Sequence, residues 1–191
     1  MKQRRPRLFG RLHFFLVYLI VSFACILFIG SYVYASEKDK ETVSSSNELV
    51  FLSASELEEK IKSHQVTSLE VVNAYLDHIK KYNHIFLNAI VTLDKDAAIR
   101  RAKEADAVLA RGELWGPLHG VPITIKDNVA TRGLKTTNSY PLTAGYVPDF
   151  DATVVARLRK AGAIILGKTN LPPLAMDYQT NSPLFGITNN P

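Results

Sequence analysis

The 191 residues are 47% hydrophobic and 21% charged, which is ordinary for a globular protein and too apolar for a disordered one. The net charge of +5 lies wholly in residues 1–35, which hold five of the 23 basic residues and no acidic one, so the other 18 basic residues balance the 18 acidic ones. A basic surface for nucleic acid is therefore not indicated, and we expect no nucleic-acid partner.

The first 35 residues have the order of an export signal. Basic residues end at Arg11, an uncharged apolar run extends from Phe14 to Ile29, and Val33-Tyr34-Ala35 precedes Ser36 in the manner of a signal-peptidase site. The uncharged stretch 14–35 is also long enough to span a bilayer, so a cleaved signal peptide and a transmembrane anchor both remain open. In either case we expect an extracytoplasmic protein, secreted or anchored to the cell membrane, because the basic block holds the N-terminus inside.

Residues 36–49 form a polar linker between this segment and the folded part. Cys25 is the only cysteine, so residues 36–191 can build neither a disulfide nor a cysteine-bearing metal site. The histidines of residues 36–191 show no close helical pairing of the kind that binds zinc, and we interpret them as surface or packing residues: His64, His78, His84 and His119. We expect no metal and no cofactor.

Two capping boxes mark the starts of the first two predicted helices. Ser53 with Glu56, and Thr67 with Glu70, have the spacing at which a hydroxyl and a carboxylate satisfy each other's backbone amides.

Further along the chain, predicted strands and helices alternate. Apolar periodicity predicts strands at 88–93, 121–126 and 163–166 and helices at 94–111 and 151–161. This alternation favours an α/β fold.

The strand at 121–126 ends in Lys126. Val121, Ile123 and Ile125 form its apolar face, and Gly120 lies among the glycines and prolines that bracket it. A lysine held at such a strand end is expected to be partly desolvated, which lowers its pKa toward neutrality and suits it to act as a general base. The alternative is a lysine that extends from the strand end into water.

Residues 162–169 satisfy the phosphate-binding pattern of a glycine, four residues, then Gly-Lys-Thr. That chemistry needs the four residues to form a loop that opens a helix, whereas 163–166 is an apolar run typical of a strand and Leu171-Pro172-Pro173 blocks a following helix. We therefore reject a nucleotide site and interpret Gly162 as the cap of the preceding helix.

Four stretches in the same order resemble the amidase signature family: 116–128 (GPLHGVPITIKDN), 132–137, 151–170 and 181–191. The resemblance covers residues 50–191 and implies the N-terminal part of a domain with a mixed β-sheet flanked by helices, here preceded by the N-terminal apolar segment. It also implies hydrolysis of small carboxylic amides by a Lys, cis-Ser, Ser triad, with Lys126 as the lysine. Ala175 and Met176 match the loop that lines the acyl side of the substrate pocket, although Met176 could equally fill a core.

Both serines of the family triad are missing. The family's Gly-Gly-Ser-Ser-Gly-Gly run, with its oxyanion hole, follows the Asn-Pro that is Asn190-Pro191 here, and Ser139 and Ser182 match no triad serine. We therefore predict the truncated N-terminal fragment of an exported amidase, inactive alone. The alternatives are a non-catalytic binding or regulatory module, or one half of a split enzyme whose complementing chain carries the serines. The export signal argues against an amidotransferase component, which would act on tRNA in the cytoplasm.

Overall fold

The computed structural model describes residues 48–191. The predicted signal or anchor (1–35) and nearly all of the linker (36–49) lie outside the described residues, so export and cleavage stay predictions. Within residues 48–191, no helix is both long and apolar enough to cross a membrane.

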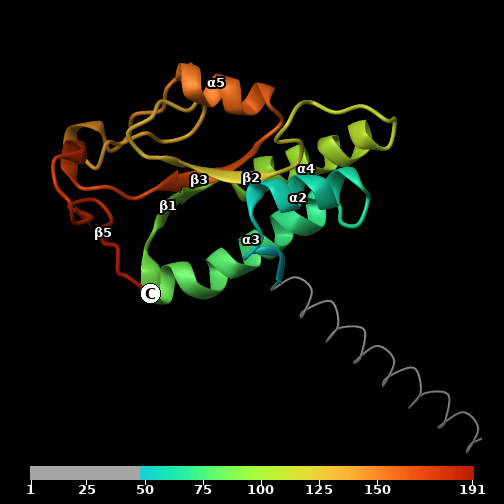
Figure 1. Ribbon diagram of the computed structural model, residues 1–191. Helices are drawn as coiled ribbons and strands as arrows, with labels where there is room; N and C mark the ends of the chain where they lie inside the picture. The colour runs from blue at the N-terminus through green and yellow to red at the C-terminus, as the bar shows by residue number, and fades with distance from the viewer. Residues whose placement is uncertain (1–47) are drawn as a thin grey trace, which may run out of the picture. The chain divides into compact units, whose positions relative to one another are not determined.

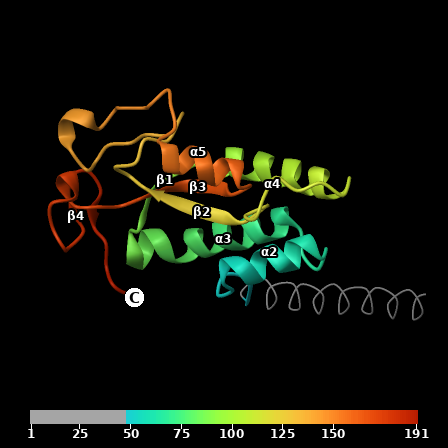
Figure 2. The same cartoon turned by 45° about the horizontal axis from the view of Figure 1, so that its top comes forward.

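A three-stranded mixed sheet forms the centre of the fold. Its strands are β1 (Ile90–Leu93), β2 (Pro122–Lys126) and β3 (Ile164–Thr169), with β3 between the other two (Figure 2). β2 runs parallel to β3, and β1 runs antiparallel to it. The expected α/β fold with a mixed sheet is thus confirmed.

Helices cover both faces of this sheet (Figure 1). On one side lie α3 (Ser68–Tyr82) and α4 (Lys95–Leu109), with α2 (Ala54–Lys62) packed beside α3. On the other side lies α5 (Thr153–Lys160), which connects β2 to β3 in the chain.

The central strand β3 is buried on both faces. Ile164 and Leu166 pack against Val72 and Ala102 of the helices α3 and α4, whereas Ile165 packs against Val155 of α5. Successive residues of a strand point to opposite faces, so an uninterrupted apolar run suits a strand covered on both sides.

Short elements complete the described residues. They are the π-helical turn η1 (Asn83–Leu87), the 3₁₀ turns η2 (Pro141–Thr143) and η3 (Pro173–Ala175), and a hairpin of β4 (Asn181–Ser182) with β5 (Gly186–Ile187).

Both predicted capping boxes are present. At the start of α2, the Ser53 hydroxyl accepts a hydrogen bond from the Glu56 amide. At the start of α3, the Thr67 hydroxyl accepts one from the Glu70 amide. Hydrogen bonds from Ser53 hold the pKa of the exposed Glu56 below its ordinary value.

Asp106 of α4 provides a second cap for α3. Its carboxylate accepts the amides of Ser68 at 2.7 Å and Leu69 at 3.1 Å. A helix leaves its first amides without partners, so a carboxylate from a neighbouring helix both satisfies them and joins the two helices.

Replacement of Asp106 by alanine is therefore expected to lower the free energy of unfolding by about 2 kcal/mol, because two charge-assisted hydrogen bonds are lost. Urea unfolding followed through the fluorescence of Trp115, the only tryptophan, measures this change. The matched control, Asp96→Ala at an exposed position of α4, should change it by about 0.5 kcal/mol or less. Equal losses in the two variants would contradict the capping role.

Two predicted strands differ in extent from the observed ones. The first begins at Ile90 rather than at residue 88, because Asn88 adopts φ 50° and closes η1 by donating a backbone hydrogen bond to the Asn83 carbonyl. The last continues past 166 to Thr169, because residues 167–169 keep pairing with β2.

Candidate active site at the end of strand β2

Lys126 is the last residue of β2, as the sequence predicts, and pairs in register with Thr169 of β3. Its side chain is exposed, as is that of Thr124, whereas Ile125 between them is buried. The expectation of a partly desolvated ammonium is therefore wrong for the described residues. The reason is that residues 48–191 leave this face open at the end of β2, which is an edge strand of the sheet.

The backbone beside Lys126 is held firmly. The Asp127 amide donates to the Thr169 carbonyl at 3.0 Å, and the Asn138 amide donates to the Asp127 carbonyl at 3.1 Å. The buried Asp127 carboxylate also accepts a short hydrogen bond from the Thr137 hydroxyl and another from the Thr137 amide at 3.1 Å. The loop 127–138 thus leaves β2 and returns to the residue that follows Lys126.

Burial raises the pKa of Asp127, while the hydrogen bonds from Thr137 and the positive charge of Lys168 oppose the rise. One carboxylate oxygen of Asp127 has no hydrogen-bond partner among the described residues. A buried carboxylate with one free oxygen is costly unless a cation lies near, and Lys168 is that cation.

The structure joins two serines that lie 43 positions apart in the chain. The hydroxyl of Ser139 donates to that of Ser182 at 2.7 Å, and both residues are buried. The Ser182 oxygen also accepts the amides of Leu184 at 3.2 Å and Phe185 at 3.1 Å. In residues 48–191, no hydrogen bond joins Lys126 to either hydroxyl, so the two serines and Lys126 do not form a nucleophile–base pair. The bond between the serines instead fixes the β4–β5 hairpin to the segment that follows the loop 127–138.

Strained backbone gathers close to Lys126. Asn138, Ser139, Leu174 and Ala175 all have φ between 53° and 58°, which is rare for residues other than glycine. The Leu174 amide donates to the Asn138 carbonyl at 3.0 Å, so the two strained segments meet. Such strain persists only where the surrounding structure enforces it, and it concentrates at functional sites.

The predicted substrate residues lie on the second of these segments. Ala175 ends η3, and Met176 after it is 81% exposed, so Met176 does not belong to the core of residues 48–191. Two backbone hydrogen bonds, through Asn138 and Leu174, connect this loop to Asp127.

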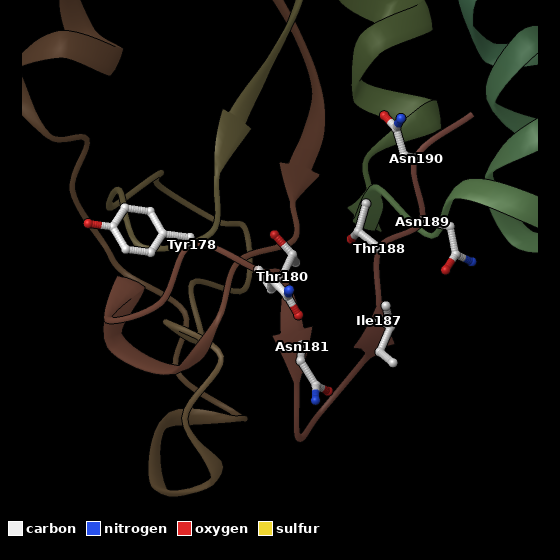
Figure 3. Close-up of a pocket in the computed structure, with 8 residues that line it drawn as sticks. Tyr178, Thr180, Asn181, Ile187, Thr188, Asn189 and Asn190 are labelled. Carbon is white, nitrogen blue, oxygen red and sulfur yellow. The ribbon is translucent and has the colours of Figure 1, made fainter.

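A hollow of about 380 Å³ lies beside the β4–β5 hairpin, further along the same loop. Figure 3 shows Asn181 and Ile187 on the two strands of the hairpin, with Tyr178 pointing away from them. The lining of the hollow is rich in amide and hydroxyl side chains and contains no charged residue: Tyr178, Gln179, Thr180, Asn181, Ile187, Thr188, Asn189 and Asn190. Such a lining suits a neutral polar ligand.

Among residues 48–191, Lys168 is the buried lysine, a role that the sequence pattern did not predict. It lies on β3 and is 0% exposed. Its ammonium donates to the Val129 carbonyl at 2.5 Å and to the hydroxyls of Thr136 at 2.9 Å and Thr131 at 3.1 Å. Since 164–169 forms a strand and this ammonium is enclosed by protein, the rejection of a phosphate-binding loop is confirmed.

Burial lowers the pKa of Lys168 from 10.5 to about 8, against the opposing effect of Asp127. Between about pH 8 and 10.5 the unfolded chain therefore holds a proton on this lysine that the folded chain has released, so stability rises with pH. The expected rise is about 3 kcal/mol, at 1.36 kcal/mol per pKa unit.

Urea unfolding from pH 7 to 10.5 measures this rise as the difference between the native chain and Lys168→Met. Other titrating groups, such as Tyr75, whose pKa burial raises, contribute to both proteins and cancel. Parallel stability curves for the two proteins would show that Lys168 does not titrate in this window.

No group of three or more metal-ligating side chains converges anywhere in residues 48–191.

Comparison with known sequences points to one family. The family model described as Amidase matches residues 70–191. The chain is 44% identical over 144 residues to a glutamyl-tRNA(Gln) amidotransferase subunit of Carboxydothermus hydrogenoformans, and this match covers 75% of this chain and 30% of that protein. The corresponding protein of Cutibacterium acnes is 43% identical over 145 residues, which cover 76% of this chain and 29% of that one.

Solved structures agree with these sequences. Fatty acid amide hydrolase superposes with a TM-score of 0.72 at 29% identity, over 76% of this chain and 26% of that enzyme. Peptide amidase from Stenotrophomonas maltophilia gives 0.68 at 33% identity, over 73% and 30% of the two chains. The chain thus spans about a third or less of the length of the proteins that it matches.

Proposed function

The chain belongs to the amidase signature family, and we propose that it forms the lysine-bearing part of a hydrolase for carboxylic amide C–N bonds. The observation that carries this proposal is the place of Lys126, which ends the parallel strand β2 beside a buried, hydrogen-bonded Asp127 and a strained loop. The resemblance assigns the role of general base to the lysine at this position.

In the proposed reaction, neutral Lys126 accepts a proton from a bridging serine, which takes one from a nucleophilic serine as that hydroxyl attacks the amide carbonyl. An ester forms between acyl group and serine, the C–N bond breaks, and the nitrogen leaves with a proton as ammonia or an amine. Water then hydrolyses the ester, releasing the carboxylic acid and the free serine.

Both serines must come from sequence outside residues 1–191, either on a continuation of the polypeptide or on a second chain. The exposure of Lys126 supports this, because a general base works in a site from which water is largely excluded. Burial of an amine favours its neutral form, so a segment that covers the end of β2 would both bring the hydroxyls and help to activate the base. The relatives in the first comparison are themselves named as subunits.

The site and the relatives together support a proposal for the substrate class. Two of the solved neighbours are named fatty acid amide hydrolase and peptide amidase, and the hollow beside β4 and β5 carries no charged side chain. We propose a neutral amide, with its acyl part against Ala175 and Met176.

The cellular location of the protein distinguishes an amide hydrolase from an amidotransferase that acts on tRNA. Identity is higher to the amidotransferase subunits than to the hydrolases, but the predicted export signal would place the chain away from tRNA. We propose that the protein is exported and that water receives the acyl group. Mass spectrometry of the chain from extracytoplasmic fractions tests this, and recovery from the cytoplasm alone with an intact N-terminus would favour the transferase reading.

One observation favours a second candidate, a non-catalytic module on the amidase scaffold. Lys126 is exposed and hydrogen-bonds to neither Ser139 nor Ser182, so the described residues contain no assembled triad. Such a module would bind amides without cleaving them.

A serine-directed fluorophosphonate probe, combined with an amide hydrolysis assay, decides between the two. We define the native assembly as the chain isolated from its source cell with any polypeptide bound to it. The isolated 191-residue chain should remain unlabelled, whereas the native assembly should be labelled and should release acid from neutral amides. Labelling of the isolated chain would contradict the need for outside serines. A native assembly that binds amides but neither reacts nor hydrolyses would establish the non-catalytic module.

A further inference from the structure

Lys168 and the loop 127–138 form a closed unit around a buried charge. All three N–H groups of the Lys168 ammonium have acceptors, and each acceptor lies on this loop: Val129, Thr131 and Thr136. An ammonium has three donors and no acceptor, so its hydrogen-bonding capacity is fully used here. Within residues 48–191, Asp127 is the charged group close enough to affect it.

The geometry makes the loop depend on this ammonium. Lys168 is paired with Ile125 on β2 and lies on the sheet face that α5 covers, whereas Lys126 belongs to the opposite face. The loop therefore leaves β2 after Lys126, passes over the Lys168 ammonium, and returns to Asp127 through Thr137 and Asn138. Without the Lys168 side chain, the Val129 carbonyl would keep only the hydrogen bond from the Thr131 hydroxyl, and the buried Asp127 carboxylate would lose the cation near it. Both losses are costly in a buried site.

We propose that Lys168 is a positioning residue for Lys126: the hydrogen bonds of its buried amino group close the loop 127–138 over β3 and so fix the end of β2 from which Lys126 extends. This deepens the proposed amidase function and rests on it only for the effect on catalysis. It gives a structural reason for the Gly-Lys-Thr pattern at 167–169 that a phosphate site does not. Lys168 itself touches neither solvent nor substrate, because it is fully buried.

The first test examines the closed loop by hydrogen exchange and does not require that the protein hydrolyse an amide. Amide hydrogen exchange of the 191-residue chain reports on Asp127, Thr137 and Asn138, whose amides are all hydrogen-bonded in the closed loop. In Lys168→Met these amides should exchange at least about ten times faster, with the amides of α4 unchanged. The control Lys160→Met, at an exposed position of α5, should leave all of them as they are.

A matched pair of milder variants keeps the test decisive if Lys168→Met fails to fold. Thr136→Val removes one acceptor and should speed exchange of the same three amides, and Thr136→Ser, which keeps the hydroxyl, should restore protection. Unchanged exchange in Thr136→Val, or equal exchange in the valine and serine variants, would refute the closed loop whether or not the protein is an amidase.

The second test uses the native assembly. Thr136→Val should lower kcat for amide hydrolysis about ten-fold with KM within about two-fold, and Thr136→Ser should recover most of the loss. A faster-exchanging loop with unchanged kcat would refute the positioning role. If the unaltered assembly hydrolyses no amide at all, the proposed function fails, and the exchange data alone decide whether Lys168 closes the loop.

Discussion

Replacement of Lys126 by methionine is expected to lower kcat/KM for amide hydrolysis by the native assembly about 10³-fold, because the general base of the proposed triad is removed. The same substitution should change the free energy of unfolding by about 0.5 kcal/mol or less, since the side chain is exposed and makes no hydrogen bond among the described residues. Steady-state kinetics and urea unfolding of the same preparation measure both quantities.

This contrast between a large catalytic and a small structural effect distinguishes a catalytic lysine from a structural one. Lys103→Met, at an exposed position of α4, is the matched control and should change neither quantity. A Lys126→Met assembly that retains more than about a tenth of the activity would exclude Lys126 as the general base.

The largest expected effect on stability comes from Gly167→Ala. Gly167 lies on the central strand β3, opposite Leu93 of β1 and next to the irregularity in the pairing of β3 with β2. A Cβ atom built there would lie 2.0 Å from the Thr92 carbonyl oxygen and 3.0 Å from the Leu93 Cα, both of them backbone atoms that cannot move alone. We expect β1 to be pushed from β3 and the free energy of unfolding to fall by about 3 kcal/mol or more.

Gly145→Ala is the matched control, because a Cβ there would meet nothing within 4 Å and the residue does not have positive φ. Chemical unfolding followed through Trp115 should place this control within about 0.5 kcal/mol of the native chain. A Gly167→Ala protein as stable as the control would mean that β1 can slide on β3, contrary to the described register.

The parts of the fold that local chemistry determines were predictable. The capping boxes at Ser53 and Thr67 start the observed helices, because each box needs only residues three positions apart. Strand β2 ends at Lys126 as its alternating pattern predicts. Strand order was not predictable from such patterns, since β1 and β3 are distant in the chain and meet only in the folded sheet.

The site shows the same division between local and distant interactions. Lys126 could be singled out from its strand and from the family resemblance, but its exposure depends on what covers β2, which no local pattern reports. No local pattern indicates the buried role of Lys168, because its acceptors at Val129, Thr131 and Thr136 come from a separate segment.

The sequence also did not predict the strained backbone at residues 174 and 175. Leu174 and Ala175 adopt positive φ although neither is glycine, and the hydrogen bond from the Leu174 amide to the Asn138 carbonyl helps to hold this conformation. No sequence pattern predicts that two adjacent residues other than glycine, just before Met176, both have positive φ.

A structure of the native assembly with a phosphonate bound to its reactive serine tests the central claim most directly. The account predicts that Lys126 is covered there, with its amine about 2.6–3.2 Å from the hydroxyl of a bridging serine. A labelled, hydrolysing assembly in which the Lys126 amine still lies in solvent, out of reach of any hydroxyl, would contradict it.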